Sequence, residues 1–229
     1  NHTITLTGNL YFPTGGRQIY WGTGTLIKDG NGWGIDADIT GFNNVIKKGS
    51  GWVTMYNNLD ITGNVTFYDE TNLNMQQFAL NGSAGKEFKI GADSRIYCYL
   101  AETATASGGK AFPTGFGTYD IDATNTTYIR GNEDQTILTT PTYGNLYLYD
   151  NTTRTIKLDG DLTVAGNLRM YYDYITLEDS SHNISIAGST VDLRDYTPKN
   201  TITFNGASGQ NIYAGGSYTT LKLNNVVFN

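Results

Sequence analysis

The stretch Leu158-Asp-Gly-Asp-Leu-Thr-Val-Ala-Gly-Asn-Leu-Arg-Met170 decides the fold. Its second half predicts two very short strands, Leu162-Thr-Val164 and Leu168-Arg-Met170, because apolar side chains alternate with polar ones in both. Ala165-Gly-Asn167 connects them. Each strand therefore has one side suited to a core and one side suited to water.

The same pattern occurs twice more along the chain. Ile4-Thr-Leu-Thr-Gly-Asn-Leu-Tyr-Phe12 and Leu59-Asp-Ile-Thr-Gly-Asn-Val-Thr-Phe67 repeat it position by position. Copies of one motif predict a repeat protein built of short strands. The pairs Gly8-Asn9, Gly63-Asn64 and Gly166-Asn167 are predicted to be corners with a positive φ, which glycine adopts without steric cost and asparagine tolerates.

Two regions depart from this regular pattern. Residues 13–57 hold the three tryptophans amid many glycines, and residues 101–141 contain Phe112-Pro-Thr-Gly115, a literal repeat of Phe12-Pro-Thr-Gly15. We expect residues 1–229 to form a single β-repeat region, a fragment of a longer chain, with irregular insertions at 13–57 and 101–141.

The spacing of the apolar pairs distinguishes two all-β architectures. Ile156/Leu158, Leu162/Val164 and Leu168/Met170 follow one another at six-residue steps, which suit strands of about three to five residues with tight corners. In a parallel β-helix, or β-solenoid, each such strand forms one side of a coil, and inward apolar residues stack into ladders. The alternative, a β-sandwich, has strands of about five or six residues joined by hairpins. The short steps favour the solenoid.

Composition narrows the classes of partner. Aromatic residues make up 13% of the chain and charged residues only 16%, which is typical of an ordered chain. The net charge of -6 argues against nucleic acid and against an anionic membrane surface, since both require basic patches. No apolar run is long enough for membrane insertion. Cys98 is the one cysteine, so no internal disulfide forms, and its apolar surroundings predict a buried, inert thiol.

Several segments resemble a known family. Asn205-Gly-Ala-Ser-Gly-Gln-Asn-Ile212 followed by Tyr218-Thr-Thr-Leu-Lys-Leu223 is similar to the repeat units of the large secreted surface proteins and adhesins of Bacteroidota. So is Tyr143-Gly-Asn-Leu-Tyr-Leu148 with the stretch that follows it. The likeness covers Leu59 to Asn229. It implies export, commonly by the type IX secretion route, and display at the cell surface or release, and it implies no catalytic residues.

Pairs of aspartates are the candidate metal ligands. Asp36 and Asp38 lie at alternate positions, as do Asp120 and Asp122, so each pair can share one polar face. Paired carboxylates on a β-helix can bind Ca²⁺ or act as acid and base in polysaccharide lyases and hydrolases. Half-exposed strands show the same spacing without any such role. We expect no enzyme and no cofactor, with Ca²⁺ as the possible exception.

Five aromatic residues are the candidate carbohydrate-binding residues. Trp21, Trp33, Trp52, Tyr20 and Tyr56 lie outside the regular repeat, and exposed rings beside glycines offer flat faces to sugars. The alternative is that the indoles fill the core.

Tyrosine pairs form a separate aromatic group within the repeats. Tyr147/Tyr149 and Tyr171/Tyr172 are predicted to lie on outer strand faces and to form cross-strand aromatic ladders.

The sequence thus favours a structural or adhesive segment, a stalk or adhesin, of a long extracellular cell-surface β-repeat protein. Its partners would be surface glycans or neighbouring repeats of the same polypeptide. A carbohydrate-binding or carbohydrate-active β-helix module is the alternative from another class, and a phage-type fibre segment is the third.

Overall fold

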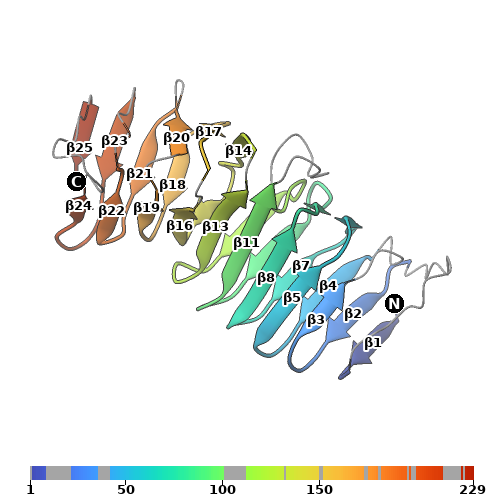
Figure 1. Ribbon diagram of the computed structural model, residues 1–229. Helices are drawn as coiled ribbons and strands as arrows, with labels where there is room; N and C mark the ends of the chain where they lie inside the picture. Colours follow the sequence, from blue (N-terminus) through green and yellow to red (C-terminus); the bar gives the residue numbers. More distant parts are fainter. Residues whose placement is uncertain are drawn as a thin grey trace.

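The computed structural model in Figure 1 describes residues 2–8, 22–35, 42–100, 112–131, 133–149, 152–172, 175–179, 182–194, 196, 200–213, 223 and 225–229. Within these ranges the chain contains strands and no helix, and the strands stack in parallel as a β-solenoid of about 8 turns. The prediction of a parallel β-helix is confirmed, and the β-sandwich alternative is wrong.

The first face of the coil consists of two sheets. The six-stranded sheet contains, in order, β1 (Thr3–Leu6), β2 (Thr25–Lys28), β4 (Asn44–Lys47), β7 (Val65–Phe67), β10 (Glu87–Ile90) and β12 (Thr118–Ile121). The five-stranded sheet contains β15 (Thr142–Tyr143), β18 (Leu162–Val164), β21 (Ile184–Ile186), β23 (Thr201–Phe204) and β25 (Asn225–Phe228). β12 contacts β15, so one sheet follows the other along the axis.

The second face is one continuous nine-stranded sheet, whose strands lie side by side from end to end in Figure 1. In order it contains β3 (Trp33–Ile35), β5 (Gly51–Met55), β8 (Thr71–Gln76), β11 (Arg95–Leu100), β13 (Thr126–Gly131), β16 (Asn145–Leu148), β19 (Leu168–Met170), β22 (Thr190–Asp192) and β24 (Asn211–Tyr213).

The third face is shorter and divided. It comprises β6 (Leu59–Asp60) and β9 (Leu80–Asn81) in one sheet, and β14 (Gln135–Ile137), β17 (Arg154–Leu158) and β20 (Ile175–Glu178) in another.

Inward side chains form the core as axial ladders. Leu146, Leu168 and Val191 pair in successive turns of the second face, and all three are fully buried. The alternation of apolar and polar residues produces this arrangement, because every second side chain of a strand points to the same side. Each buried aliphatic side chain stabilises the coil by about 1.5–3 kcal/mol relative to an exposed one.

Asparagine side chains connect the corners of adjacent turns. The Asn145 Oδ1 atom accepts a hydrogen bond from the backbone N–H of Asn167 at 2.9 Å, and Asn167 Oδ1 accepts one from the N–H of Thr190 at 2.8 Å. Asn44 and Asn64 act in the same way in earlier turns: Asn44 Oδ1 accepts a hydrogen bond from the N–H of Asn64 at 2.9 Å, and Asn64 Oδ1 accepts one from the N–H of Glu87 at 3.0 Å. The asparagine of the repeated motif therefore satisfies a corner N–H group that the ladders leave unpaired.

The glycines of the motif have a different role from the predicted one. Gly8, Gly63 and Gly166 do not have a positive φ, so the prediction for them was wrong. At Gly166 the constraint is close approach: a Cβ atom there would lie 2.6 Å from Asn145 Oδ1 and 2.8 Å from the carbonyl oxygen of Gly144. The positive φ values fall at other corners, among them Gly49 with φ 74° and Gly51 with φ 106°.

Two lysines occupy corners that the sequence did not predict as core. Lys28 and Lys47 are buried, and the Lys47 ammonium donates to the carbonyl oxygens of Gly30, Lys48 and Gly49, each at 2.7 Å. These carbonyls satisfy the three donors of the ammonium group. Burial first, and then the neighbouring Lys28, lower the pKa of Lys47.

The described parts of both predicted insertions belong to the coil, which corrects that expectation. Within 13–57, β2 and β4 pair in the first face and β3 and β5 in the second. Within 101–141, β12 pairs with β10, and β13 pairs with β11 and β16. Residues 9–21, 36–41 and 101–111 lie outside the described residues.

We expect Gly166→Ala to lower the free energy of unfolding by about 1–3 kcal/mol, because the new methyl group overlaps the adjacent corner. Gly209→Ala is the matched control, since a Cβ atom there meets nothing within 4 Å and the φ of Gly209 is not positive. Urea denaturation followed by circular dichroism measures both. Equal losses in the two variants would contradict the close-approach explanation.

We expect stability to fall as the pH rises above about 10, the pKa of tyrosine in an unfolded chain. Burial raises the pKa of Tyr119 to about 12 and that of Tyr143 well above its ordinary value, so the unfolded chain loses these protons first.

Tyr143→Phe removes a 2.6 Å hydrogen bond to the Leu138 carbonyl and lowers stability by about 1 kcal/mol at neutral pH. Tyr143→Phe should also reduce the slope with which the free energy of unfolding falls as the pH rises above about 10, as measured by urea denaturation at a series of pH values. The exposed Tyr213 provides the control Tyr213→Phe, and an equal slope in all three proteins would contradict the assignment.

Candidate functional site

A continuous row of aromatic rings lies on the outer side of the second face. We name it the aromatic strip and define it as Trp52, Tyr97, Tyr128, Tyr147, Tyr149, Tyr171 and Tyr172. Its members point outward because their neighbours in the strands point inward, as Ile96 and Cys98 do on either side of Tyr97. The predicted contacts among Tyr147, Tyr149, Tyr171 and Tyr172 are present. Only Tyr147 lies in a strand, however, because Tyr149 follows β16 and Tyr171 and Tyr172 follow β19.

The parallel register places the rings of the strip in contact. Tyr97 pairs with Tyr128, and Tyr128 pairs with Tyr147, in successive strands. The Tyr97 and Tyr128 rings stack with centroids 4.8 Å apart and planes 3° apart. Trp52 stacks on Tyr97 at 5.2 Å, and Tyr147 meets Tyr171 edge to face at 5.5 Å. A spacing of about 4.7–4.9 Å between neighbouring strands produces these distances directly.

Arginines are interleaved with the rings. The guanidinium carbon of Arg130 lies 5.3 Å from the Tyr149 ring centroid, and that of Arg169 lies 5.6 Å from the Tyr147 centroid. A hydrogen bond to Tyr97 raises the pKa of Arg95. The strands β5, β8, β11, β13, β16 and β19 contain these three arginines and no Asp or Glu. The strands that carry the strip therefore have three positive side chains and no carboxylate, within a chain of net charge -6.

Two adjacent open hollows lie on the strip. One has a volume of about 380 Å³ and is lined by Asn74, Gln76, Gln77, Tyr97, Tyr99 and Arg130. The other has a volume of about 310 Å³ and is lined by Tyr97, Tyr128, Arg130, Tyr149 and Tyr171. Tyr97 and Arg130 belong to both, so the two hollows form one extended concave surface.

A β-bulge shapes the first hollow. The register between β8 and β11 shifts between Tyr97 and Cys98, and Gln76 has a φ of 48°. The backbone N–H of Gln76 donates to Asn74 Oδ1 at 3.1 Å. A bulge bends its strand and redirects side chains, and here it lies beside the lining amides of Gln76 and Gln77.

The structure exposes some of the predicted carbohydrate-binding residues and buries another. Trp52 is 46% exposed and Tyr56 is 51% exposed, and both line a third hollow of about 360 Å³. Trp33 is only 3% exposed and packs in the core, so its indole face cannot stack on a sugar in this structure. Tyr20 and Trp21 lie outside the described residues.

The sequence reasoning missed Tyr97, Tyr128 and Arg130. The outward position of Tyr97 follows from the alternation Ile96-Tyr-Cys-Tyr-Leu100, and that of Tyr128 and Arg130 from Thr127-Tyr-Ile-Arg-Gly131.

The aspartates predicted as Ca²⁺ ligands are engaged in protein contacts where the structure describes them. Asp120 forms an ion pair with Lys89. Asp122 accepts hydrogen bonds from the N–H and hydroxyl of Thr124, at 2.9 and 2.8 Å, and these bonds lower its pKa. Asp36 and Asp38 lie outside the described residues. Within the described ranges, His, Cys, Asp and Glu form no group of three that could hold a metal.

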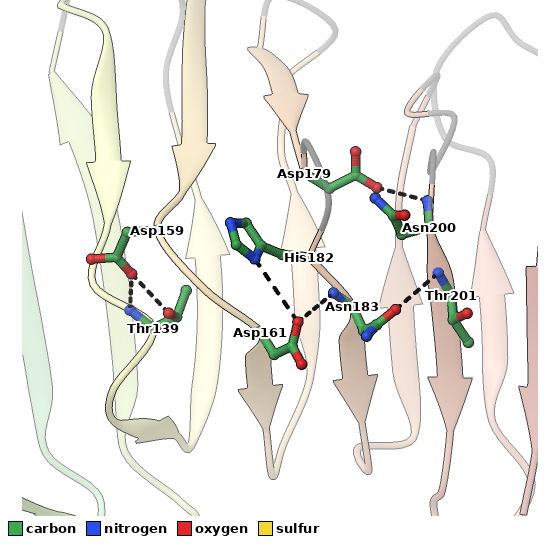
Figure 2. Close-up of polar contacts among 8 residues, drawn as sticks. All are labelled: Thr139, Asp159, Asp161, Asp179, His182, Asn183, Asn200 and Thr201. Atoms are coloured by element: carbon green, nitrogen blue, oxygen red, sulfur yellow. Dashed lines mark hydrogen bonds and ion pairs between the residues drawn. The ribbon is translucent and has the colours of Figure 1, made fainter.

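Figure 2 shows a polar cluster at the corner where the chain passes from the third face to the first, between β17 and β18. Asp159 Oδ1 accepts hydrogen bonds from the N–H and hydroxyl of Thr139, at 2.8 and 2.7 Å. Asp161 Oδ1 accepts one from the N–H of Asn183 at 2.8 Å and lies 4.0 Å from His182 Nδ1. These carboxylates hold adjacent turns together, in the same manner as the corner asparagines.

The comparisons with known proteins give no further information about the site. The chain matches no protein-family model, no curated protein and no solved structure. A search of the described residues finds no helix of the length and apolarity needed to cross a membrane.

We expect the stacked pair Tyr97 and Tyr128 to be energetically coupled by about 0.5–1.5 kcal/mol. A double-mutant cycle with Tyr97→Ala and Tyr128→Ala, measured by urea denaturation, gives this coupling. The control cycle combines Tyr97→Ala with Tyr213→Ala, because Tyr213 lies in β24, several turns away. Equal coupling in the two cycles would show that the stack does not contribute to stability.

Proposed function

We propose that this chain is an adhesive segment of a protein displayed outside the cell, and that the aromatic strip binds glycan chains. One observation carries the proposal: contacting rings run along one face from Trp52 on β5 to Tyr171 after β19, over open hollows. Trp52 is exposed and the tyrosines of the strip are half-buried, and contiguous apolar surface at a protein exterior often marks a binding site.

The chemistry of the strip suits sugar rings. The C–H groups on one side of a pyranose ring pack on an aromatic face, and hydroxyl groups at the ring edge need hydrogen-bond partners. Tyr97 and Tyr99 supply aromatic surface in the first hollow, while Asn74, Gln76 and Gln77 supply amide groups. A hollow with apolar walls and a few polar groups is the usual form of a small-ligand site.

The solenoid suits binding to a polymer. Its strands fix the rings in a straight, repeating array, and stacked repeats create extended binding surfaces. Sites carried on strands are also held more rigidly than sites carried on loops.

The distribution of carboxylates supports binding rather than hydrolysis. Glycosidases use two carboxyl groups that flank the bond to be broken. The six strands that carry the strip, from β5 to β19, contain none.

We expect Tyr128→Ala and Tyr147→Ala each to weaken glycan binding at least about tenfold, as is typical of truncating a central aromatic anchor. Glycan arrays identify the ligand, and affinity electrophoresis in gels containing that polysaccharide measures the loss. Tyr68→Ala is the matched control, because Tyr68 is 49% exposed but lies outside the strip. The proposal fails if the wild-type chain binds no glycan, or if Tyr68→Ala weakens binding as much as the strip variants do.

A further inference from the structure

The position of Arg130 on the strip points to a more specific ligand. Its side chain is exposed at the end of β13 and lines both adjacent hollows. Among the described residues, no carboxylate forms an ion pair with it and no acceptor receives a hydrogen bond from its guanidinium group. The Tyr149 ring, 5.3 Å from the guanidinium carbon, is the contact that holds it in place.

The other arginines of this face are engaged by the protein. Arg194 donates to the carbonyl oxygens of Met170 and Tyr171, at 2.8 and 2.9 Å, and lies 3.7 Å from an Asp192 oxygen. Hydrogen bonds to Tyr97 and Tyr171 raise the pKa values of Arg95 and Arg169, and the buried Nε atom of Arg169 has no hydrogen-bond partner. Arg130 therefore has the donor capacity on this surface that an incoming ligand can use.

We propose that the strip binds a polyuronate, a polysaccharide of carboxylated sugars, and that Arg130 binds the sugar carboxylate. This inference rests on the proposed glycan-binding function and specifies its ligand class. Guanidinium pairs with carboxylate through two parallel hydrogen bonds, and the cation–π contact with the Tyr149 ring is not itself a hydrogen bond. Tyr97 and Tyr128, which line the same hollow as Arg130, supply the aromatic surface that the sugar ring contacts.

The charge distribution agrees with an anionic polymer. The strands β5 to β19 of the second face contain Arg95, Arg130 and Arg169 and no acidic residue, although the chain as a whole has a net charge of -6. Asp192, on β22 of the same face, lies beside Arg194, while Asp120 lies on the first face and Glu178 on the third. The three arginines attract an anionic chain to the strands β5 to β19.

Polygalacturonate and its methyl ester are the probes that test the carboxylate contact. They share one backbone, and the ester hides the charge. We expect wild-type protein to bind the free acid more tightly than the ester in isothermal titration calorimetry. Arg130→Gln should weaken binding of the free acid roughly ten- to hundredfold, the loss expected for hydrogen bonds to a charged group, and should leave binding of the ester within about twofold.

Two control variants separate a specific contact from general charge. Arg130→Lys keeps the charge but loses the paired geometry, so it should recover less than half of the lost binding free energy. Lys157→Gln removes an equivalent exposed positive charge from the third face, where Lys157 lies 3.8 Å from Glu178, and should leave binding unchanged. Thermal unfolding of each variant checks that the fold is intact.

The outcomes distinguish this inference from the function on which it rests. Equal binding of acid and ester, or an equal effect of Arg130→Gln on both, would overturn the carboxylate contact while the glycan-binding function stands. Equally tight binding of dextran sulfate would also overturn it, since that result shows attraction to any polyanion. Binding of none of these polymers, together with an empty glycan array, would overturn both proposals.

Discussion

Each strand of this protein finds its hydrogen-bond partners in the turn before and the turn after, and this constraint governs the rest of the structure. Strands of two to six residues cannot satisfy their own N–H and C=O groups, so stability depends on axial register. The corners face the same requirement, and the side chains of Asn145 and Asn167 meet it by accepting N–H groups of the following turn. At the corner of β4, the buried ammonium of Lys47 satisfies carbonyl groups in the same way.

The strand register that aligns the core residues also aligns the aromatic residues of the candidate site. Inward residues such as Leu146 and Leu168 are brought into line by the same pairing that aligns Tyr128 with Tyr147 on the outside. Trp52, Tyr97, Tyr128 and Tyr147 lie in strands, so the sheet itself fixes their positions, and the other three rings of the strip follow directly after β16 and β19. A polymer with a repeating structure is the natural ligand for a surface that repeats at the strand spacing.

The sequence predicted the architecture well because the alternation around Gly166-Asn167 expresses a local rule. It predicted the corner glycines poorly, because the space around Gly166 is limited by Gly144 and Asn145 of another turn, which local pattern cannot show. Lys28 and Lys47 made residues 13–57 look irregular, since a lysine at a core position obscures the apolar period. The pairing of Tyr97 with Tyr128 was missed because their spacing in the sequence, 128 - 97 = 31 residues, differs from the 147 - 128 = 19 residues between Tyr128 and its next partner Tyr147.

A crystal structure of the protein with an oligogalacturonate bound is the most direct test that the aromatic strip is the binding surface. We expect the oligosaccharide to lie across Tyr97 and Tyr128, with its sugar rings in contact with the tyrosines and a carboxylate paired with Arg130. An oligosaccharide bound to the first or third face, with the strip left bare, would contradict the assignment of the second face as the functional surface of this solenoid.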